Sequence, residues 1–345
     1  MESLSLREIE DEARRRLDPV VYDYFAGGAE DEVTVRANEA SFARIGLVPR
    51  VLCGGRTREL AVTLLDRRAA LPVVVAPTAF HRLAHPDGEL ATARAAAKAG
   101  VIMIASMAST VAIEEIAETG VDLWFQLYVQ PDLGFTEQLI RRAEAVACAA
   151  LVVSVDSPVF GRRERDLRNG FLDLPPGMAC AHMDGRDIAF RSDLSWDHID
   201  WLRSVTALPI VLKGVLHPED ARLAVDHGID ALAVSNHGGR QLDTVPATIE
   251  MLPQVTDAVG GAVPLLLDGG VRRGTDVLKA LALGADAVAI GRPVLWGLAV
   301  DGEAGVARVL GMLRAEFDQA LALCGCRSPR DVSPDLIWRK TCREC

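Results

Sequence analysis

The sequence Ala231-Leu-Ala-Val-Ser-Asn-His-Gly-Gly-Arg-Gln-Leu-Asp243 passes directly from an apolar run to a glycine-rich polar segment. We expect residues 231–234 to form a strand covered on both faces, because continuous apolar runs of this length are typical of parallel strands. The polar segment places His237 and Arg240 on a turn, where a base and a cation suit removal of a proton from a molecule that carries a carboxylate. Its glycines favour a sharp turn and leave room for a flat ligand. A polar strand end with a capping histidine is the alternative that this segment alone leaves open.

Apolar runs of the same kind recur along the chain, separated by alanine-rich stretches with helical spacing. The predicted strands are Leu71–Ala76, Val101–Ala105, Leu123–Leu127, Leu151–Val155, Pro209–Leu212, Ala231–Val234, Val263–Leu267 and Ala287–Ile290. The clearest helices between them are predicted at Gly88–Ala99, Asp132–Ala147, Pro218–His227 and Gly274–Leu283. Eight strand–helix repeats predict an α/β fold of the (β/α)8 TIM-barrel type. A doubly wound open sheet is the alternative, but it does not require eight repeats.

The interiors of the predicted strands are almost all aliphatic, and every C-terminal end carries a group suited to polar contacts. In chain order these ends carry Pro77-Thr78-Ala79, Ser106, Gln126 with Tyr128, Ser154 with Asp156, Lys213, Ser235 with His237, Asp268, and Gly291 with Arg292. The carboxyl ends of the strands form the active site in barrels of this type. The sequence therefore predicts that these residues converge on one site.

The last two strand ends have the features of an anion site. Asp268-Gly269-Gly270-Val271-Arg272 leads into a predicted helix, and Gly291-Arg292 ends the eighth strand. Barrels commonly bind phosphate at these two loops, beside a helix N-terminus. The glycines offer backbone N–H groups and the arginines add charge-assisted donors. Arginines that only form exposed salt bridges are the alternative.

The composition limits the classes of partner and compartment. The chain has 345 residues and a formal net charge of −11, which disfavours nucleic acid or an anionic membrane as a general partner. No apolar stretch is long enough to cross a bilayer. Residues 1–18 are predicted to form an amphipathic surface helix rather than an export signal. With seven cysteines and no such signal, we expect reduced thiols and a cytoplasmic protein.

Two cysteine pairs have the close spacing found in some metal sites. They are Cys324-Gly325-Cys326 and Cys342-Arg343-Glu344-Cys345. No histidine follows Cys324, and the second pair occupies the last four residues of the sequence. The spacing rules for zinc ligands therefore predict no metal site.

Several motifs follow one another in an order that is typical of one family. They are Tyr22-Asp23-Tyr24, Ala76-Pro77-Thr78-Ala79, Ala84-His85-Pro86, Gln126-Leu127-Tyr128, Gly161-Arg162-Arg163-Glu164, Leu212-Lys213-Gly214, Ser235–Asp243 and Asp268–Asp276. In these motifs the chain resembles the FMN-dependent 2-hydroxy-acid oxidases and dehydrogenases, the group of glycolate oxidase, lactate oxidase and mandelate dehydrogenase. The resemblance covers nearly the whole chain and implies an FMN cofactor and a 2-hydroxy-acid substrate.

The resemblance implies catalytic roles for His237, Asp156 and Tyr128. His237 would remove a proton from the substrate, and Asp156 would orient the imidazole and stabilise its cationic form. The residues expected to bind the substrate are Tyr24, Tyr128, Arg163, His237 and Arg240. The two guanidinium groups match a carboxylate in shape and charge. The sequence leaves open whether the electrons leave as hydride or by way of a carbanion.

The same resemblance implies a set of FMN-binding residues at the mouth of the barrel. They are Pro77, Thr78, Ala79, Ser106, Gln126, Ser154, Lys213, Ser235, Asp268, Gly269, Gly270, Arg272, Gly291 and Arg292. Lys213 would face the pyrimidine end of the flavin, where a cation favours the reduced form. The phosphate would lie on the last two loops. Asp268 would bind a ribityl hydroxyl, because a carboxylate repels phosphate.

The chain is expected to be one FMN-binding barrel domain over residues 1–345. Residues 1–60 would form an N-terminal helical extension, residues 61–325 the barrel, and residues 169–194 a mobile lid loop after the fourth strand. Membrane-bound relatives carry an apolar anchor near the lid, whereas Asp184-Gly185-Arg186-Asp187 interrupts such a patch here. A member without that anchor usually passes electrons to dioxygen and forms hydrogen peroxide.

Ala108 is the residue that bears on the identity of the substrate. Glycolate oxidases carry a tryptophan at this position, so the pocket should admit a larger acid, and Phe80, Met107, Phe171 and Met178 are candidates to line it. We expect (S)-4-hydroxymandelate or mandelate, oxidised to 4-hydroxybenzoylformate or its analogue. A lactate- or glycolate-type oxidase, or a dehydrogenase with another electron acceptor, is the alternative. The resemblance also implies a homotetramer.

Overall fold

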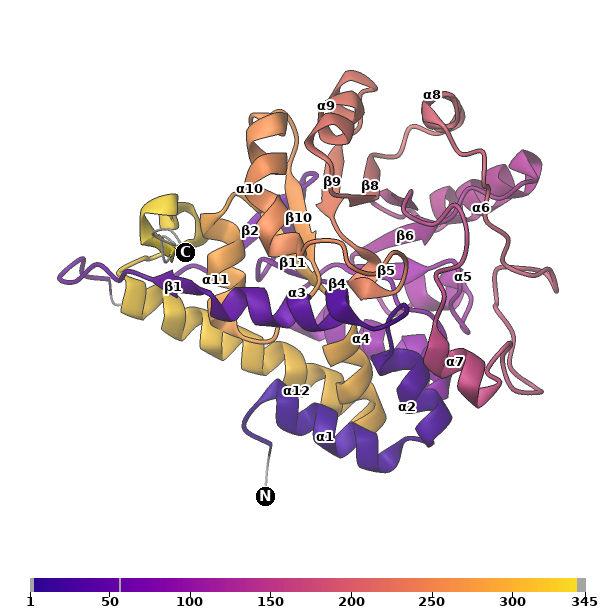
Figure 1. Ribbon diagram of the computed structural model, residues 1–345, viewed down its shortest axis with the longest axis horizontal. Helices are drawn as coiled ribbons and strands as arrows, with labels where there is room; N and C mark the ends of the chain where they lie inside the picture. The colour runs from indigo at the N-terminus through magenta and orange to yellow at the C-terminus, as the bar shows by residue number, and fades with distance from the viewer. Residues whose placement is uncertain (1–2, 56, 340–345) are drawn as a thin grey trace.

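Eight parallel strands close into a barrel at the centre of the computed structural model, which describes residues 3–55 and 57–339 (Figure 1). Their order around the barrel is β10-β11-β4-β5-β6-β7-β8-β9. The strands are β4 (Val73–Val75), β5 (Met103–Ser106), β6 (Leu123–Leu127), β7 (Leu151–Ser154), β8 (Ile210–Val215), β9 (Ala231–Val234), β10 (Leu265–Asp268) and β11 (Ala287–Ile290). The prediction of a (β/α)8 barrel is confirmed.

Three strands extend further toward the barrel mouth than their apolar runs predicted: β5, which gains Ser106, and two strands that gain a charged residue. β8 continues through Lys213 to Val215, with a shift of register where Gly214 adopts φ +110°. β10 includes Asp268. Hydrophobicity marks these strands only as far as their covered part, whereas backbone pairing continues under the charged side chains. The two ionisable groups are therefore held by strands rather than by loops.

The barrel interior is filled mainly by side chains from alternate strand positions. Val74, Trp124 and Leu266 belong to this inner cluster, whereas the neighbouring Val73 belongs to the outer core between strands and helices. A hairpin of β2 (Val62–Leu64) and β3 (Arg67–Ala69) adds buried residues to the inner cluster. This end lies opposite to the carboxyl ends of the strands.

Helices surround the barrel (Figure 1). They are α4 (Gly88–Ala99), α5 (Ile113–Ala117), α6 (Leu133–Ala145), α7 (Glu164–Asn169), α8 (Trp196–Val205), α9 (Pro218–Asp226), α10 (Thr248–Val259), α11 (Gly274–Ala282) and α12 (Arg292–Cys324). The four helices predicted most clearly are present to within two residues at each end. Asp132 lies just outside α6 because its carboxylate caps the helix, accepting from the Phe135 N–H at 3.2 Å.

The N-terminal extension contains helices α1 (Leu6–Arg16), α2 (Pro19–Ala26) and α3 (Val33–Ala43) and strand β1 (Ile45–Leu47). Helix α1 is amphipathic, as predicted, and buries Leu6, Ile9 and Ala13 on the side that packs against α12. Strand β1 pairs with β12 (Ile337–Arg339) near the other end of the chain. Helix α3 packs against the short helix η2 (His237–Gly239), so the extension reaches the candidate site.

Residues 170–194, the greater part of the predicted lid, contain no helix or strand. They are nevertheless held at more than one internal point. The Ala189 N–H donates to Gln130 Oε1 at 3.2 Å and its carbonyl accepts from Gln130 Nε2 at 2.8 Å, and His182 is fully buried. Its Nε2 accepts from the Ile113 N–H at 2.9 Å, and its Nδ1 donates to the Met107 carbonyl at 3.1 Å. The stretch before this anchor exposes Leu172 almost completely. The lid is therefore an irregular loop with a buried anchor, and its mobility stays a prediction.

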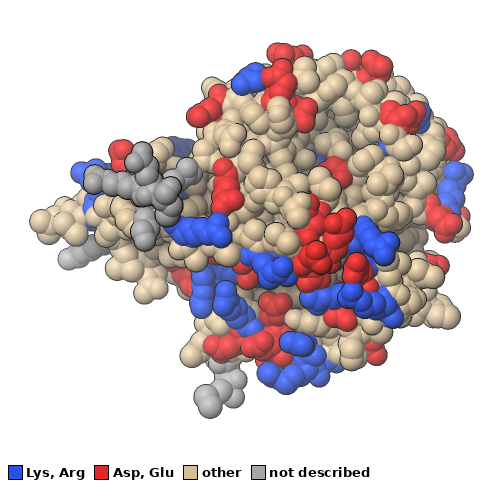
Figure 2. Space-filling view, in the orientation of Figure 1, with Lys and Arg blue, Asp and Glu red and all other residues tan. Residues whose placement is uncertain are grey.

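The surface in view carries charges of both signs (Figure 2), and the described cysteines are free thiols. Figure 2 shows acidic and basic side chains side by side on the face in view, without a uniformly basic surface. Within residues 3–55 and 57–339, no helix is long and apolar enough to cross a membrane, and no three histidine, cysteine, aspartate or glutamate side chains are grouped to hold a metal ion. Cys324 and Cys326 are free thiols, and the pair Cys342 and Cys345 lies outside the described residues.

Two cavities, of about 550 and 490 Å³, open at the amino end of the barrel beside the β2–β3 hairpin. Three arginines face the larger one, but Arg58 is already paired with Asp318 at 2.7 Å, and Arg68 with Glu59 at 3.3 Å. The candidate site lies at the other end of the barrel, where the strand-end residues gather.

Candidate active site

The turn that carries His237 has a left-handed backbone at three consecutive residues. His237, Gly238 and Gly239 have φ values of +56°, +63° and +74°. This conformation costs a residue with a side chain about 1–2 kcal/mol, so the surrounding contacts must hold it. The Ser235 hydroxyl accepts from the His237 N–H at 3.1 Å, and the Asn236 side chain accepts from the Gly239 N–H at 3.2 Å. The two glycines allow the turn, and the two polar side chains fix it.

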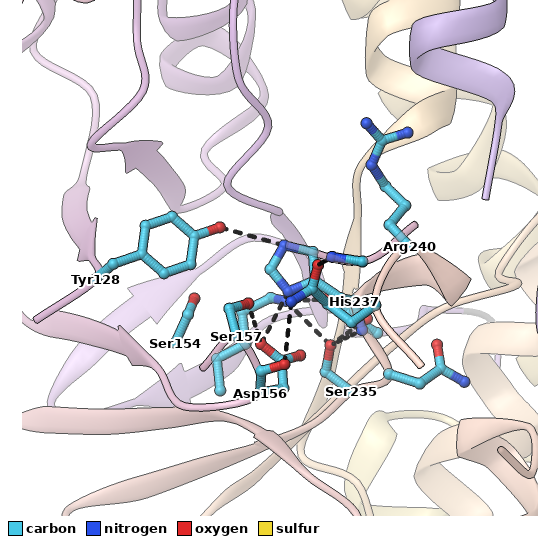
Figure 3. Close-up of polar contacts among 12 residues, drawn as sticks. Tyr128, Ser154, Asp156, Ser157, Ser235, His237 and Arg240 are labelled. Carbon is cyan, nitrogen blue, oxygen red and sulfur yellow. Dashed lines mark hydrogen bonds and ion pairs between the residues drawn. The ribbon is translucent and has the colours of Figure 1, made fainter. Parts of the chain in front are cut away.

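His237 lies between a carboxylate and a phenol. Its Nδ1 is 2.9 Å from Asp156 Oδ1, and its Nε2 is 3.3 Å from the Tyr128 hydroxyl. Figure 3 shows Asp156 and Tyr128 on different sides of the imidazole ring. With Asp156 accepting from Nδ1–H, the lone pair of Nε2 faces the barrel mouth on the side of Tyr128. This is the arrangement required of a general base.

Burial favours the neutral form of the imidazole at rest, although the Asp156 charge acts against it. Burial lowers the pKa of His237 below its ordinary value, and the cations Lys213 and Arg163 act in the same direction. For Asp156, burial acts to raise the pKa, but the adjacent imidazole and Lys213 outweigh it and hold the pKa below its ordinary value. Asp156 is therefore an anion beside a neutral base, ready to stabilise an imidazolium.

Gly214 makes the position of Asp156 possible. A Cβ atom on Gly214 would lie 2.5 Å from the Asp156 Cγ, well inside contact distance. The left-handed φ of Gly214 also allows the change of register in β8. From the sequence, Gly214 is noted only within the motif Leu212-Lys213-Gly214, although a glycine directly after the strand-end Lys213 was a usable signal of close approach.

Arg240 is fixed by the N-terminal extension. Its guanidinium donates to the carbonyls of Tyr24 and Gly27 at 2.6 and 2.9 Å and lies 4.9 Å from the centre of the Tyr24 ring. Burial and the nearby Arg163 lower the pKa of Arg240 to about 9. Two buried cations that repel each other favour binding of an anion between them, as a carboxylate clamp requires.

Arg163 has weaker partners than Arg240. Its closest carboxylate, Asp166, is 4.0 Å away, and its Nε donates to the Arg240 carbonyl at 3.5 Å. Its side chain is only 17% exposed. A guanidinium that is mostly buried and loosely paired retains donors for a substrate carboxylate.

Tyr24 belongs to an aromatic group at the barrel mouth. Its ring lies 5.7 Å from that of Phe80 and 4.7 Å from that of Phe171, between ring centres. Burial raises the pKa of both Tyr24 and Tyr128, so each phenol stays a neutral donor. Of the four residues proposed to line a large pocket, Phe80 and Phe171 are brought to Tyr24, whereas Met107 is fully buried and Met178 is 36% exposed.

Three of the predicted flavin contacts form a chain across neighbouring strands. The Ser106 hydroxyl donates to Gln126 Oε1 at 3.1 Å, and Gln126 Nε2 donates to the Ser154 hydroxyl at 3.2 Å. Ser106 and Gln126 are register partners in the parallel sheet. These two hydrogen bonds fix which end of the Gln126 amide is the donor.

Lys213, Ser235 and Asp268 form a second polar group at the mouth. Lys213 Nζ lies 3.2 Å from Asp268 Oδ2 and donates to the Ser235 hydroxyl at 3.0 Å, which donates to Asp268 Oδ1 at 2.8 Å. Burial acts to lower the pKa of Lys213, but Asp268 and Asp156 outweigh it and raise the pKa. Lys213 is therefore a fixed cation at the barrel mouth, and its place beside the flavin stays a prediction.

The predicted phosphate loop has two features that suit an anion: a backbone with left-handed glycines and a buried donor without a partner in the part of the chain that the structure describes. Gly269 and Gly270 have φ values of +103° and +84°. Arg272 pairs with Glu39 at 2.8 Å, while its buried Nε has no hydrogen-bond partner among the described residues. A buried N–H of this kind is costly unless a ligand accepts from it. These residues fit a phosphate.

Arg292 and Thr78 make contacts that the sequence analysis did not anticipate. Arg292 donates to the carbonyls of Phe25, Gly27 and Gly238 at 2.8–2.9 Å, so it ties the N-terminal extension to the turn of His237. Thr78 is bound through its hydroxyl to His81 Nε2 at 2.6 Å. The FMN contacts of Pro77, Thr78, Ala79, Gly291 and Arg292 stay predictions.

Comparison with known proteins identifies the family. Residues 13–339 match the family model described as FMN-dependent dehydrogenase. The chain belongs to this family. Its cofactor is FMN, which the polar groups around Gln126, Lys213 and Arg272 are suited to hold.

The relatives of this FMN-dependent dehydrogenase oxidise 2-hydroxy acids. The chain is 47% identical to glycolate oxidase 3 of Arabidopsis thaliana, covering 96% of this chain and 95% of the relative. It is 46% identical to L-lactate oxidase of a Nostoc species, covering 97% and 98%. Solved structures of mandelate oxidase, among them one with benzoyl-formic acid, match it with a TM-score of 0.93 at 44% identity and cover 98% of this chain and 99% of that chain. The protein is thus an FMN-dependent 2-hydroxy-acid oxidase.

Proposed function

We propose that this oxidase acts on an (S)-2-hydroxy acid with an aromatic side chain, 4-hydroxymandelate or mandelate. The products would be the 2-oxo acid and, from dioxygen, hydrogen peroxide. The observation that carries the proposal is the aromatic group of Tyr24, Phe80 and Phe171 beside Ala108. The Phe80 N–H donates to the Ala108 carbonyl at 3.2 Å, so a methyl group, rather than an indole, lies on the segment next to this aromatic group.

Each side chain of the site has a distinct task in the proposed reaction. Arg163 and Arg240 bind the substrate carboxylate, and this fixes the substrate before any bond changes. Tyr24 and Tyr128 donate hydrogen bonds to the carboxylate and hydroxyl. These contacts orient the carbon that carries the hydroxyl toward the flavin side of the site.

Proton removal falls to His237. Its neutral Nε2 takes the proton, and Asp156 at 2.9 Å from Nδ1 stabilises the imidazolium that forms. Bound FMN supplies the two-electron acceptor for the oxidation. Lys213 adds a fixed positive charge on the flavin side and so favours the reduced state.

The mandelate oxidase structures support the aromatic substrate, because one of them contains (S)-mandelic acid. A glycolate- or lactate-type oxidase is the second candidate, since those relatives have slightly higher identity at 46–47%. Cytoplasmic location and a tetrameric assembly are further proposals that rest on the sequence alone.

The test is a comparison of substrates in the absence of oxygen. The purified protein is mixed with (S)-4-hydroxymandelate, (S)-mandelate, (S)-lactate or glycolate, and the visible flavin absorbance is followed in a stopped-flow instrument. We expect the two aromatic acids to bleach the flavin fastest, and air to restore the colour with one peroxide per turnover. Faster bleaching by lactate or glycolate would replace the aromatic substrate with the second candidate. Bleaching that air does not reverse would contradict dioxygen as acceptor.

A further inference from the structure

Asn38 in helix α3 joins the N-terminal extension to the turn of the catalytic base. Its side chain is buried and forms a reciprocal amide pair with Asn236. Asn38 Nδ2 donates to Asn236 Oδ1 at 2.8 Å, and Asn236 Nδ2 donates to Asn38 Oδ1 at 2.8 Å. Two parallel hydrogen bonds of this kind hold both amides in one plane and one orientation.

Asn236 needs that orientation because it supports the His237 turn. Its Oδ1 accepts from the Gly239 N–H at 3.2 Å, and its Nδ2 also donates to the Pro246 carbonyl at 3.3 Å. A reversed amide would direct a donor at the Gly239 N–H and an acceptor at the Pro246 carbonyl. By fixing the Asn236 amide, Asn38 stabilises the left-handed conformation of His237.

Asn38 also touches the loop that we assign to the FMN phosphate. A Cβ atom on Gly270 would lie 2.0 Å from the Asn38 carbonyl oxygen, and one on Gly269 would lie 3.2 Å from Asn38 Nδ2. The Thr248 N–H donates to Asn38 Oδ1 at 3.3 Å. Asn38 therefore contacts the base turn, the phosphate loop and the start of helix α10 at once.

Helix α3 is fixed against the turn at a second point, one turn before Asn38. The Asp243 carboxylate accepts from the N–H groups of Val33 and Thr34 at 3.1 and 2.8 Å. A Cβ atom on Gly239 would lie 2.7 Å from a Val35 methyl group. The helix cannot shift without moving the turn, so Asn38 is held as firmly as the groups that it joins.

We propose that Asn38 is a positioning residue that couples the FMN-phosphate loop to the turn of His237. The inference rests on the proposed roles of His237 and of the phosphate loop. It states that the side chain from the N-terminal extension aligns the base while the same residue supports the loop under the phosphate. Loss of its amide pair should therefore weaken FMN binding and slow proton removal together.

Two variants test the coupling. Asn38→Asp keeps the shape but places an acceptor 2.8 Å from Asn236 Oδ1, and Asn38→Leu removes both polar groups without adding a charge. FMN affinity is measured by quenching of flavin fluorescence on addition of apoprotein. Substrate-driven flavin reduction is measured without oxygen over a range of mandelate concentrations. We expect the FMN dissociation constant to rise, and the limiting reduction rate to fall, each about 10- to 100-fold, the scale of one lost buried hydrogen-bonding partner.

Two further readings separate positioning from a general loss of structure. The apparent dissociation constant of the substrate should change less than the reduction rate, because Arg163 and Arg240 do not contact Asn38. In Asn38→Leu the acid limb of the pH–rate profile, where the rate falls as the base becomes protonated, should move to higher pH. The reason is that a loosened turn exposes His237 and raises its pKa toward the ordinary value. Asp156, Lys213 and Arg163, which face the imidazole, are unchanged in this variant.

Ser41→Ala is the matched control on the same helix. The Ser41 hydroxyl is buried and donates to Glu250 at 2.8 Å, away from the base turn. We expect this variant to keep the FMN affinity, the reduction rate and the pH profile of the parent, even if its melting temperature falls. If Asn38→Asp and Asn38→Leu behave like Ser41→Ala, the proposal is wrong.

A failure of the proposed function gives a different result. Parent protein that mandelate and the other 2-hydroxy acids do not reduce, or a His237→Ala variant that is reduced normally, overturns the role of His237 whatever Asn38 does. If Asn38→Asp does not fold, Asn38→Leu carries the test, since it buries no charge. If neither variant is soluble, Asn236→Ala must reproduce the slow reduction and the shifted pH profile, and a parent-like Asn236→Ala contradicts the coupling.

Discussion

The part of the active site that carries His237 is buried or half-buried and held by hydrogen bonds, whereas residues 170–194 contain no helix or strand. We refer to residues 235–240 with Asp156 as the base side, and to residues 170–194 as the lid side. The base side is fixed by strand ends, by glycines and by helix α3. The lid side is held at His182 and Ala189 and exposes Leu172 and part of Met178.

This difference suggests a division of tasks. A proton transfer requires the base to be held within a fraction of an ångström, which only a rigid support provides. A pocket for the substrate side chain needs shape more than rigidity, and a loop can supply it. Substitutions on the base side should therefore slow the reaction with every substrate. Substitutions around the pocket for the substrate side chain should instead change which substrate is preferred.

The largest effect is expected from His237→Ala. The variant should still bind FMN, since His237 is not among the predicted flavin contacts, but loss of the base should slow flavin reduction by at least about 10²- to 10⁴-fold. The loss should be similar for mandelate, lactate and glycolate. Stopped-flow reduction without oxygen measures it, and near-normal reduction with any one acid would break the assignment of the base side.

Asp156→Asn should have the next largest effect. The amide oxygen can still accept from His237 Nδ1–H, so the orientation of the ring survives while the negative charge is lost. A hydrogen bond to a charged group contributes about 1.5–3 kcal/mol, which corresponds to a loss of roughly 10- to 150-fold in the reduction rate. Loss of the anion should also lower the pKa of His237 further and move the acid limb to lower pH. A limb that moves to higher pH would contradict this role of Asp156.

The parent enzyme should itself show a displaced acid limb. Burial lowers the pKa of His237 below 6.5, and the neutral imidazole is the active base. The rate should therefore fall on the acid side with a midpoint below pH 6.5. The second-order rate constant of flavin reduction at low substrate concentration, which reports the free enzyme, measures this against pH. A limb above 6.5 would show that the base is less buried in the working enzyme than in this structure.

The barrel and its strand ends could be predicted from the sequence because two strong signals coincide there. Apolar runs of strand length identify the strands, and a polar residue directly after each run marks the mouth. Gln126, Ser154 and Lys213 were found in this way, and the structure brings each of them to the mouth. The helix from Gly88 to Ala99 was predicted residue for residue, since Gly100 ends it with a left-handed φ of +66°.

Residues whose importance depends on distant partners could not be predicted. Asn38 and Asn236 are 198 positions apart, and nothing local in either segment indicates the pair. Gly214 was visible in its motif, but the reason that it is required was not, because Asp156, which follows β7, lies against it. The anchor at His182 was missed because the surrounding residues have loop composition. Arg292 could be recognised as important, but its contacts with the carbonyls of the N-terminal extension depend on how α2 packs.

Ala108→Trp tests the pocket for the substrate side chain. An added indole overfills the space beside Phe80, and overpacking of this kind costs about 1–3 kcal/mol, so turnover of mandelate should fall roughly 5- to 150-fold. Glycolate lacks the aromatic ring and should be affected much less, and it serves as the internal control. Steady-state peroxide production with both acids gives the ratio. Equal losses would show that Ala108 acts through the base side or through the fold.

Tyr128→Phe should have the smallest effect, and it tests where the two sides meet. The Tyr128 hydroxyl is 3.3 Å from His237 Nε2, while its ring centre is 4.9 Å from that of Phe190 on the lid side. The substitution keeps the ring and removes one neutral hydrogen bond, about 0.5–1.5 kcal/mol, so the reduction rate should fall about two- to tenfold. Substrate binding should hold, because the arginine clamp is intact; weaker binding with an unchanged reduction rate would contradict this.

The dependence of this rate loss on substrate and pH shows whether Tyr128 acts with the base side or with the lid side. Burial raises the pKa of Tyr128, so the phenol stays a donor over the working pH range and the loss should not depend on pH. A loss that is the same for mandelate, lactate and glycolate would mean that the hydroxyl acts on the shared 2-hydroxy-acid group, with the base side. A loss confined to mandelate would mean that Tyr128 acts through Phe190 and the shape of the pocket, because only the aromatic acid reaches that part of the site.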